Sequence, residues 1–184
     1  MAEPIIFKTG DVINYIYTGK AGNPKLSKDT SRVITQTLHV GRDMYEVAKD
    51  PTASAWDIMR HDAQSCLTCP FAASQGAEKG ACYVREFNQE RAIKGQIKAI
   101  IRRFPTYASI PTLNAEITAK IIKYCTGKFV RFGTYGEPIF LPLPLLEKMV
   151  SASAGWTGYT HQWKKFTSHS KYFMASVHSA EQQR

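Results

Sequence analysis

Three of the four cysteines of this sequence lie between positions 66 and 82, in a segment rich in glycine, alanine and serine. Cys66 and Cys69 are separated by two residues, which lets the backbone turn so that both thiolates face one metal. Cys82 follows a Gly-Ala pair and can return to the same point. A segment of this composition packs poorly by itself but can wrap a ligand. The sequence therefore predicts a Cys-rich metal or cluster loop at about residues 62–83.

Composition and charge narrow the class of protein. With 184 residues, of which 43% are hydrophobic and 21% charged, we expect a single domain over residues 1–184. The net charge of +9 favours polyanionic partners, most often nucleic acid, and DNA binding is predicted on this ground.

The first residues lack the charged-then-apolar pattern of a signal peptide, and no apolar run approaches the ~20 residues needed to span a bilayer. We therefore expect a cytoplasmic protein with no membrane partner. In a reducing compartment, clustered cysteines indicate metal ligands or catalytic thiols rather than a disulfide framework.

Apolar periodicity and turn residues predict strands that alternate with helices. Strands are expected at 31–40, 128–132, 158–163 and 172–177. Helices are expected at 53–59, 84–104 and 143–152, with another that begins near Thr112 or Asn114 and ends near Gly127. The polar, turn-rich residues 18–25 predict a loop or an arm. This order favours an α/β fold with a parallel sheet and crossover helices, and a partial (half) barrel is one form of it.

These cysteines are compatible with either of two inorganic centres, an iron–sulfur cluster or a zinc ion. A four-iron cluster takes thiolates, typically four, and Cys66, Cys69 and Cys82 supply three. The fourth ligand is left open between Cys125, a histidine (His61 is nearest in sequence) and an exogenous small molecule. Cys125 also lies on the apolar stripe of a predicted helix, where a cysteine packs as a small hydrophobe. The uneven spacing favours a 4Fe-4S cluster, with zinc as the alternative.

Three further residues are candidates for catalysis. Arg131 and Glu137 flank a loop with two glycines at a predicted strand end. Parallel sheets place their ligand-binding sites at such strand ends. Arg131 could hold a carboxylate or phosphate, and Glu137 could accept a proton or orient a ligand. His161, at a second strand end, could be a ligand or a proton carrier. The alternatives are a plain turn with two surface charges and a structural histidine.

A basic stripe on one predicted helix is a candidate phosphate-tracking surface, and two lysines near the end of the sequence add to it. The residues are Arg91, Lys94, Lys98, Arg102, Lys164 and Lys165. A solvated helix face is the default interpretation, because Glu90 can pair with Lys94 at four-residue spacing. Few aromatic residues interleave with these charges, so no platform for stacking single strands is evident.

Five segments, taken in order, resemble a known family. They are Gly22–Leu26, Cys66–Pro70, Gly80–Tyr83, Arg131–Pro138 and Tyr159–His161. The sequence is similar to the gene-product-eighty-eight-like proteins of phages, plasmids and integrative elements, which have no established activity. The resemblance implies an α/β fold in which the cysteine loop and the strand ends face one site, with Cys66, Cys69 and Cys82 as shared cysteines. It does not extend to Cys125, and Glu137 stands where relatives often have Asp.

Three functions fit these features. The first is an iron–sulfur protein of a mobile genetic element that acts on or near nucleic acid. The second is an enzyme in which three thiolates leave one iron open for radical or Lewis-acid chemistry. The third is a structural zinc-binding adaptor. The sequence does not decide whether the chain is an enzyme.

Overall fold

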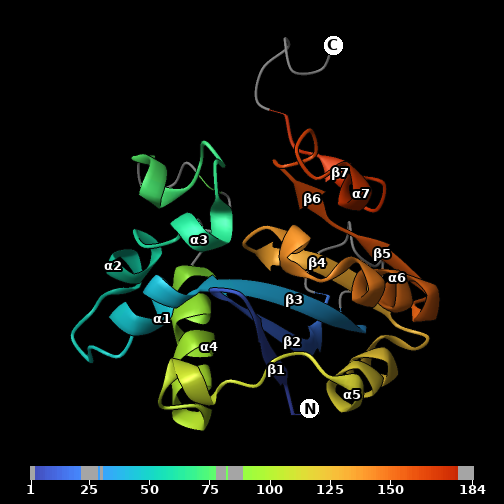
Figure 1. Cartoon of the computed structure of the whole chain (residues 1–184), viewed down its shortest axis with the longest axis horizontal. Helices are drawn as coiled ribbons and strands as arrows, with labels where there is room; N and C mark the ends of the chain where they lie inside the picture. The colour runs from blue at the N-terminus through green and yellow to red at the C-terminus, as the bar shows by residue number, and fades with distance from the viewer. Residues whose placement is uncertain (1–2, 22–28, 30, 78–81, 83–88, 178–184) are drawn as a thin grey trace.

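The computed structural model describes residues 3–21, 29, 31–77, 82 and 89–177. Its centre is a five-stranded sheet in the order β1-β2-β3-β4-β5 (Figure 1). The strands are β1 (Ile5–Thr9), β2 (Val12–Lys20), β3 (Val33–Gly41), β4 (Phe129–Tyr135) and β5 (Gly155–Thr157). A separate pair, β6 (Tyr159–Thr160) and β7 (Met174–Ala175), follows the sheet in sequence.

The sheet combines two kinds of pairing. β1, β2 and β3 are antiparallel neighbours, and a two-residue turn with Gly10 at φ +58° joins the first two. β3, β4 and β5 are parallel, which requires crossover connections. The α/β fold class is confirmed, and the sheet is open rather than closed into a barrel. The predicted parallel arrangement applies to β3–β5, whereas the antiparallel strands β1 and β2 were not predicted.

Helices cover both faces of the sheet. Their bounds are α1 (Arg42–Val47), α2 (Ala55–Met59), α3 (Ala63–Cys66), α4 (Gln89–Arg103), α5 (Ala115–Cys125), α6 (Leu143–Ala152) and α7 (Thr167–Ser170). One core joins α2 and α4 to alternate residues of β2 such as Ile13 and Tyr15. The other joins α5 and α6 to residues of the opposite face, including Ile16 and Phe132. The sheet therefore lies between two helical layers.

Local sequence explains the helices that were predicted. Asn114 caps the start of α5, where its side chain accepts a hydrogen bond from the N–H of Ile117 at 2.8 Å. The α6 helix matches its predicted range, and Ser54 caps the start of α2 through a reciprocal capping box with Asp57. Of the helix predicted at 84–104, residues 84–88 lie outside the described part of the chain. In the segment 18–25, residues 18–20 belong to β2 and residues 22–25 are outside the described part.

Among the described residues, no helix combines the length and the apolar character that crossing a membrane requires. The predicted strands after α6 are shorter than expected. Only Tyr159 and Thr160 of the range 158–163 are extended in β6, and only Met174 and Ala175 of 172–177 in β7.

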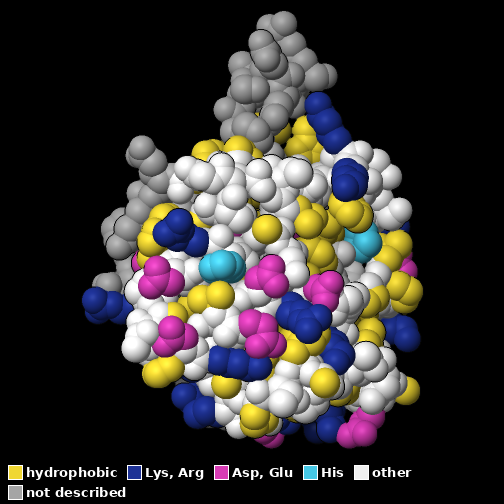
Figure 2. Space-filling model, turned by 60° about the vertical axis from the view of Figure 1, so that its left-hand side comes forward, with side chains coloured by type: hydrophobic (Ala, Val, Ile, Leu, Met, Phe, Trp, Pro, Cys, Tyr) yellow, Lys and Arg dark blue, Asp and Glu magenta, His cyan; other side chains and the backbone are white. Residues whose placement is uncertain are grey.

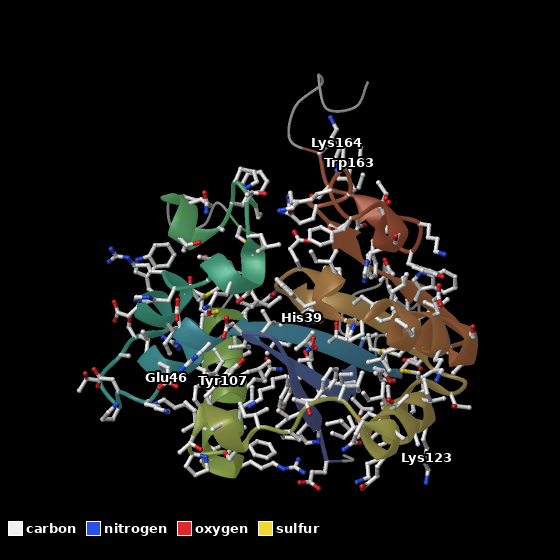
Figure 3. The ribbon with its side chains drawn as sticks, in the orientation of Figure 1. His39, Glu46, Tyr107, Lys123, Trp163 and Lys164 are labelled. Atoms are coloured by element: carbon white, nitrogen blue, oxygen red, sulfur yellow. The ribbon has the colours of Figure 1, made fainter. Side chains whose placement is uncertain are left out.

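A neutral histidine lies inside the sheet. His39 of β3 has no solvent exposure, and it lies near the centre of the molecule in Figure 3. Its Nδ1 is 2.9 Å from Asn14 Oδ1 and its Nε2 is 3.1 Å from Thr37 Oγ1. Burial lowers the pKa of His39 from 6.5 to about 3. The ring is therefore uncharged at neutral pH. It links β3 to β2 through its hydrogen bond with Asn14.

The buried His39 should make stability fall in acid. Below about pH 6.5 the unfolded chain binds a proton at His39, whereas the folded chain does so only near about pH 3. In this window wild type should lose up to about 1.4 kcal/mol per pH unit more than His39→Gln, which has no such proton. Urea denaturation at a series of pH values measures the slope for both proteins. Carboxylates contribute equally to the two slopes, so parallel curves would contradict the prediction.

Candidate metal centre

A cavity of 390 Å³ lies where β4 ends. Figure 1 shows α3 on one side of this strand end and the β6–β7 pair on the other. Three cysteines, two carboxylates and a histidine line the cavity, which places the chemistry at the carboxyl ends of parallel strands. The lining residues used below are Asp62, Cys66, Cys69, Cys82, Tyr135, Gly136, Glu137, His161 and Ser176.

The backbone turns sharply between the first two cysteines. Cys66 ends α3, and the N–H of Cys69 donates to the carbonyl of Cys66 at 3.0 Å. Leu67 between them has φ 49° and ψ −125°, a conformation that costs a non-glycine residue about 1–3 kcal/mol. Such strain persists only where the surroundings fix it. The strained turn brings both cysteines to the cavity wall, as the two-residue spacing predicts.

Hydrogen bonds join the three segments that form the walls. The N–H of Glu137, just after β4, donates to the carbonyl of Ser65 in α3 at 2.8 Å. The side-chain amide of Gln162 donates to Thr68 Oγ1 between the cysteines at 3.0 Å. These contacts fix the cysteine turn against both the end of β4 and the segment that follows β6.

Glu137 and His161 form a buried pair. Thr160 Oγ1 donates to Glu137 Oε2 at 2.6 Å, and the backbone N–H of His161 donates to Oε1 at 3.1 Å. The ring Nδ1 of His161 is 3.3 Å from the same Oε1, and its Nε2 is 3.9 Å from Cys69 Sγ. Burial alone would lower the pKa of His161, but contacts with Cys69 and Glu137 outweigh it and raise that pKa to about 9.

Asp62 and Tyr135 complete the wall below Cys66, and sequence reasoning gave them no role. The carboxylate of Asp62 accepts from the backbone N–H groups of Ala73 and Ser74 and from the Ser74 hydroxyl. Tyr135 at the end of β4 donates to Asp62 Oδ2 at 3.3 Å. Asp62 precedes α3 but makes no capping hydrogen bond with its side chain, so its role depends on tertiary contacts.

Without a bound cation, the surroundings of the cavity disfavour the deprotonated form of Cys66. Burial raises the pKa of Cys66 well above its usual range, and the charges of Asp62, Cys69 and Cys82 raise it further. The described residues that line the cavity include no lysine or arginine to offset this. A metal cation would reverse the effect by stabilising the deprotonated thiols.

Other predicted ligands lie elsewhere. Cys125 has no solvent exposure and packs in the apolar core between α5, α6 and the sheet, where burial raises its pKa to about 12. The structure therefore does not bring Cys125 to the other three cysteines. His61 is exposed and does not line the cavity. Arg131 is half-buried in the middle of β4, in register with Gln36, and it too lies outside the cavity lining.

The predicted basic residues are divided between two ends of the molecule. On α4, Lys94 donates to the carbonyl of Ala53, while Arg91 and Arg102 are exposed. Figure 2 shows acidic side chains interspersed among basic ones on the face it presents. Lys164, packed over Trp163 at 4.9 Å, is far from α4 at the upper end of Figure 3. These residues do not form one continuous stripe.

Comparisons with protein-family models, with curated proteins and with solved structures find no match for this chain. Within the described residues, no three His, Cys, Asp or Glu side chains are placed to hold a single metal ion. The chemistry of the cavity is argued below from the residues around it.

Gly136 sets the position of Glu137, so replacing it should disturb the cavity. At φ +75° a Cβ on Gly136 would lie 2.6 Å from the carbonyl oxygen of His39. Gly136→Ala should lower the free energy of unfolding by about 2–4 kcal/mol, because backbone must move. Gly10→Ala is the matched control, since Gly10 has φ +58° with open space around it. Gly10→Ala should lower the free energy of unfolding by about 1–2 kcal/mol, as measured by urea denaturation. Equal decreases for the two variants would contradict the steric argument.

Proposed function

We propose that this chain binds a 4Fe-4S cluster through Cys66, Cys69 and Cys82. One observation carries the proposal: the two thiols of the Cys66–Cys69 turn and the thiol of Cys82 line one cavity together with buried carboxylates, and the described lining has no lysine or arginine. Buried Asp62 and Glu137 are 2% and 4% exposed, so their charges act at low dielectric. Such a cavity favours a cationic inorganic core over an anionic ligand.

The size of the cavity supports a cluster more than a zinc ion. A structural zinc ion is surrounded by four ligands that meet at one point, about 2.0–2.3 Å from the metal. In a cluster each thiolate binds a different iron, so the ligands surround a volume. The cavity of 390 Å³ is within the range of about 300–1,000 Å³ in which proteins hold small molecules and cofactors.

The cluster would fasten the Cys-rich loop to the sheet and make its structure depend on redox state or oxygen. The strained turn at Leu67 and the hydrogen bond from Gln162 to Thr68 supply the rigid part of this connection. In this proposal the protein belongs to a mobile genetic element, as the family resemblance implies, and a redox-dependent loop would regulate its contact with nucleic acid.

Replacement of the cavity cysteines should abolish cluster binding. Anaerobically reconstituted wild type should contain about four iron and four sulfide per chain and absorb broadly in the visible range. Cys66→Ser, Cys69→Ser and Cys82→Ser should each lose most of the iron, whereas Cys125→Ala should keep it. Circular dichroism confirms that each variant is folded. Colourless wild type with one zinc per chain would establish the adaptor alternative instead.

Nucleic-acid binding is the second part of the proposal, and it rests on the net charge and on two lysines. Lys164 and Lys165 are exposed and follow His161 of the cavity by three and four positions. If DNA binds beside the cavity, its affinity should fall steeply with salt. Lys164→Gln with Lys165→Gln should reduce the slope of log K against log salt by about 2.

The matched control is the double variant Arg91→Gln and Arg102→Gln on α4. It removes the same charge at the opposite end of the molecule and should leave the slope unchanged. Fluorescence anisotropy with labelled duplex DNA at several salt concentrations measures both variants. Equal slopes for wild type and the Lys164–Lys165 variant, or binding that does not respond to salt, would overturn this part.

A further inference from the structure

We propose that His161 Nε2 is the fourth protein ligand of the inorganic centre, with Glu137 as the residue that positions its ring. This inference rests on the proposed cluster and names the ligand that three cysteines leave open. It replaces Cys125 and His61, the residues that the sequence offered for this position. It also makes the centre fully protein-ligated, in contrast to an iron left open for catalysis.

The first step of the argument is where Nε2 lies. It is 3.9 Å from Cys69 Sγ and 2.9 Å from Ser176 Oγ, and both of these residues line the cavity. Nε2 is thus on the cavity side of the ring, next to a thiol that is itself a proposed ligand. A metal bound at Nε2 would replace the hydrogen bond to Ser176 Oγ.

The second step is which ring nitrogen carries hydrogen. Glu137 accepts hydrogen bonds at both of its side-chain oxygens, from Thr160 Oγ1 and from the backbone N–H of His161. A carboxylate accepts only, so the Nδ1 that lies 3.3 Å away must be the donor. Nε2 is the nitrogen that faces Cys69 and the cavity. A metal that binds there would displace the Nε2 proton and use the lone pair this frees, while Nδ1 keeps its hydrogen toward Glu137.

The third step is that this arrangement is the usual surrounding of a metal-bound histidine. A ligating histidine nearly always donates its other ring N–H to a carboxylate or carbonyl, which fixes the tautomer and makes the ring a better ligand. Here Glu137 is only 4% exposed and is held by Thr160, so the ring orientation is fixed from two sides. The three other histidines that the structure describes differ: His39 is buried in the sheet, His61 is exposed outside the cavity lining, and His169 contacts the carbonyl of Leu141.

The test is pulsed EPR of the full chain after anaerobic reconstitution and reduction. Wild type should show a strong ¹⁴N hyperfine coupling from an imidazole nitrogen bound to iron. In protein labelled with ¹⁵N-histidine, a ¹⁵N coupling should replace it. His161→Cys should keep the cluster and lose the coupling. Its reduction potential should fall, because an anionic thiolate replaces a neutral imidazole. Glu137→Gln should keep the coupling and raise the potential, since a negative charge is removed.

His169→Gln is the matched control, because His169 is outside the cavity lining, and both its coupling and its potential should equal those of wild type. A wild-type cluster without ¹⁴N coupling would overturn the ligand assignment and leave the proposed function intact. A coupling that survives in His161→Cys would overturn it as well. Absence of any cluster in wild type would instead refute the proposed function. The wild-type spectrum decides alone if His161→Cys does not fold.

Discussion

The carboxylate of Glu137 is the group on which the arrangement around the cavity depends. Its oxygens accept from Thr160 and His161, and its backbone N–H binds Ser65, so one residue connects the end of β4 to β6 and to α3. A buried carboxylate without partners would be strongly destabilising. The carboxylate therefore fixes β6 against the end of β4, the backbone N–H of the same residue holds α3 there, and Gly136 allows the turn that places Glu137.

Sequence patterns predicted the helical layers well because their signals are local. The start of α5 at Asn114 and the range of α6 depend on caps and on apolar spacing within one segment. The strand β2 was missed for the opposite reason. Both of its faces are buried, so Ile13 and Asn14 are equally enclosed and the alternation that marks a half-exposed strand is lacking.

The site was predicted in part for similar reasons. Cysteine, glutamate and histidine at strand ends carry chemistry that a sequence displays, and Cys66, Glu137 and His161 do line one cavity. Arg131 belongs to the same sequence motif as Glu137, but Gly133 at φ +63° lies between them, where the register with β3 shifts. A change of register cannot be read from residue types, and so Arg131 was grouped with a cavity that it does not line.

Cys69 and His161 are 92 positions apart in the chain, yet their side chains are neighbours. Contacts of such separation form late, because the entropy of closing the intervening loop must be overcome before they stabilise anything. During synthesis the thiols would emerge well before the histidine that faces them exists. Assembly of the proposed inorganic centre would then have to follow tertiary folding. Between synthesis of the cysteines and that assembly, the thiols would be most vulnerable to oxidation.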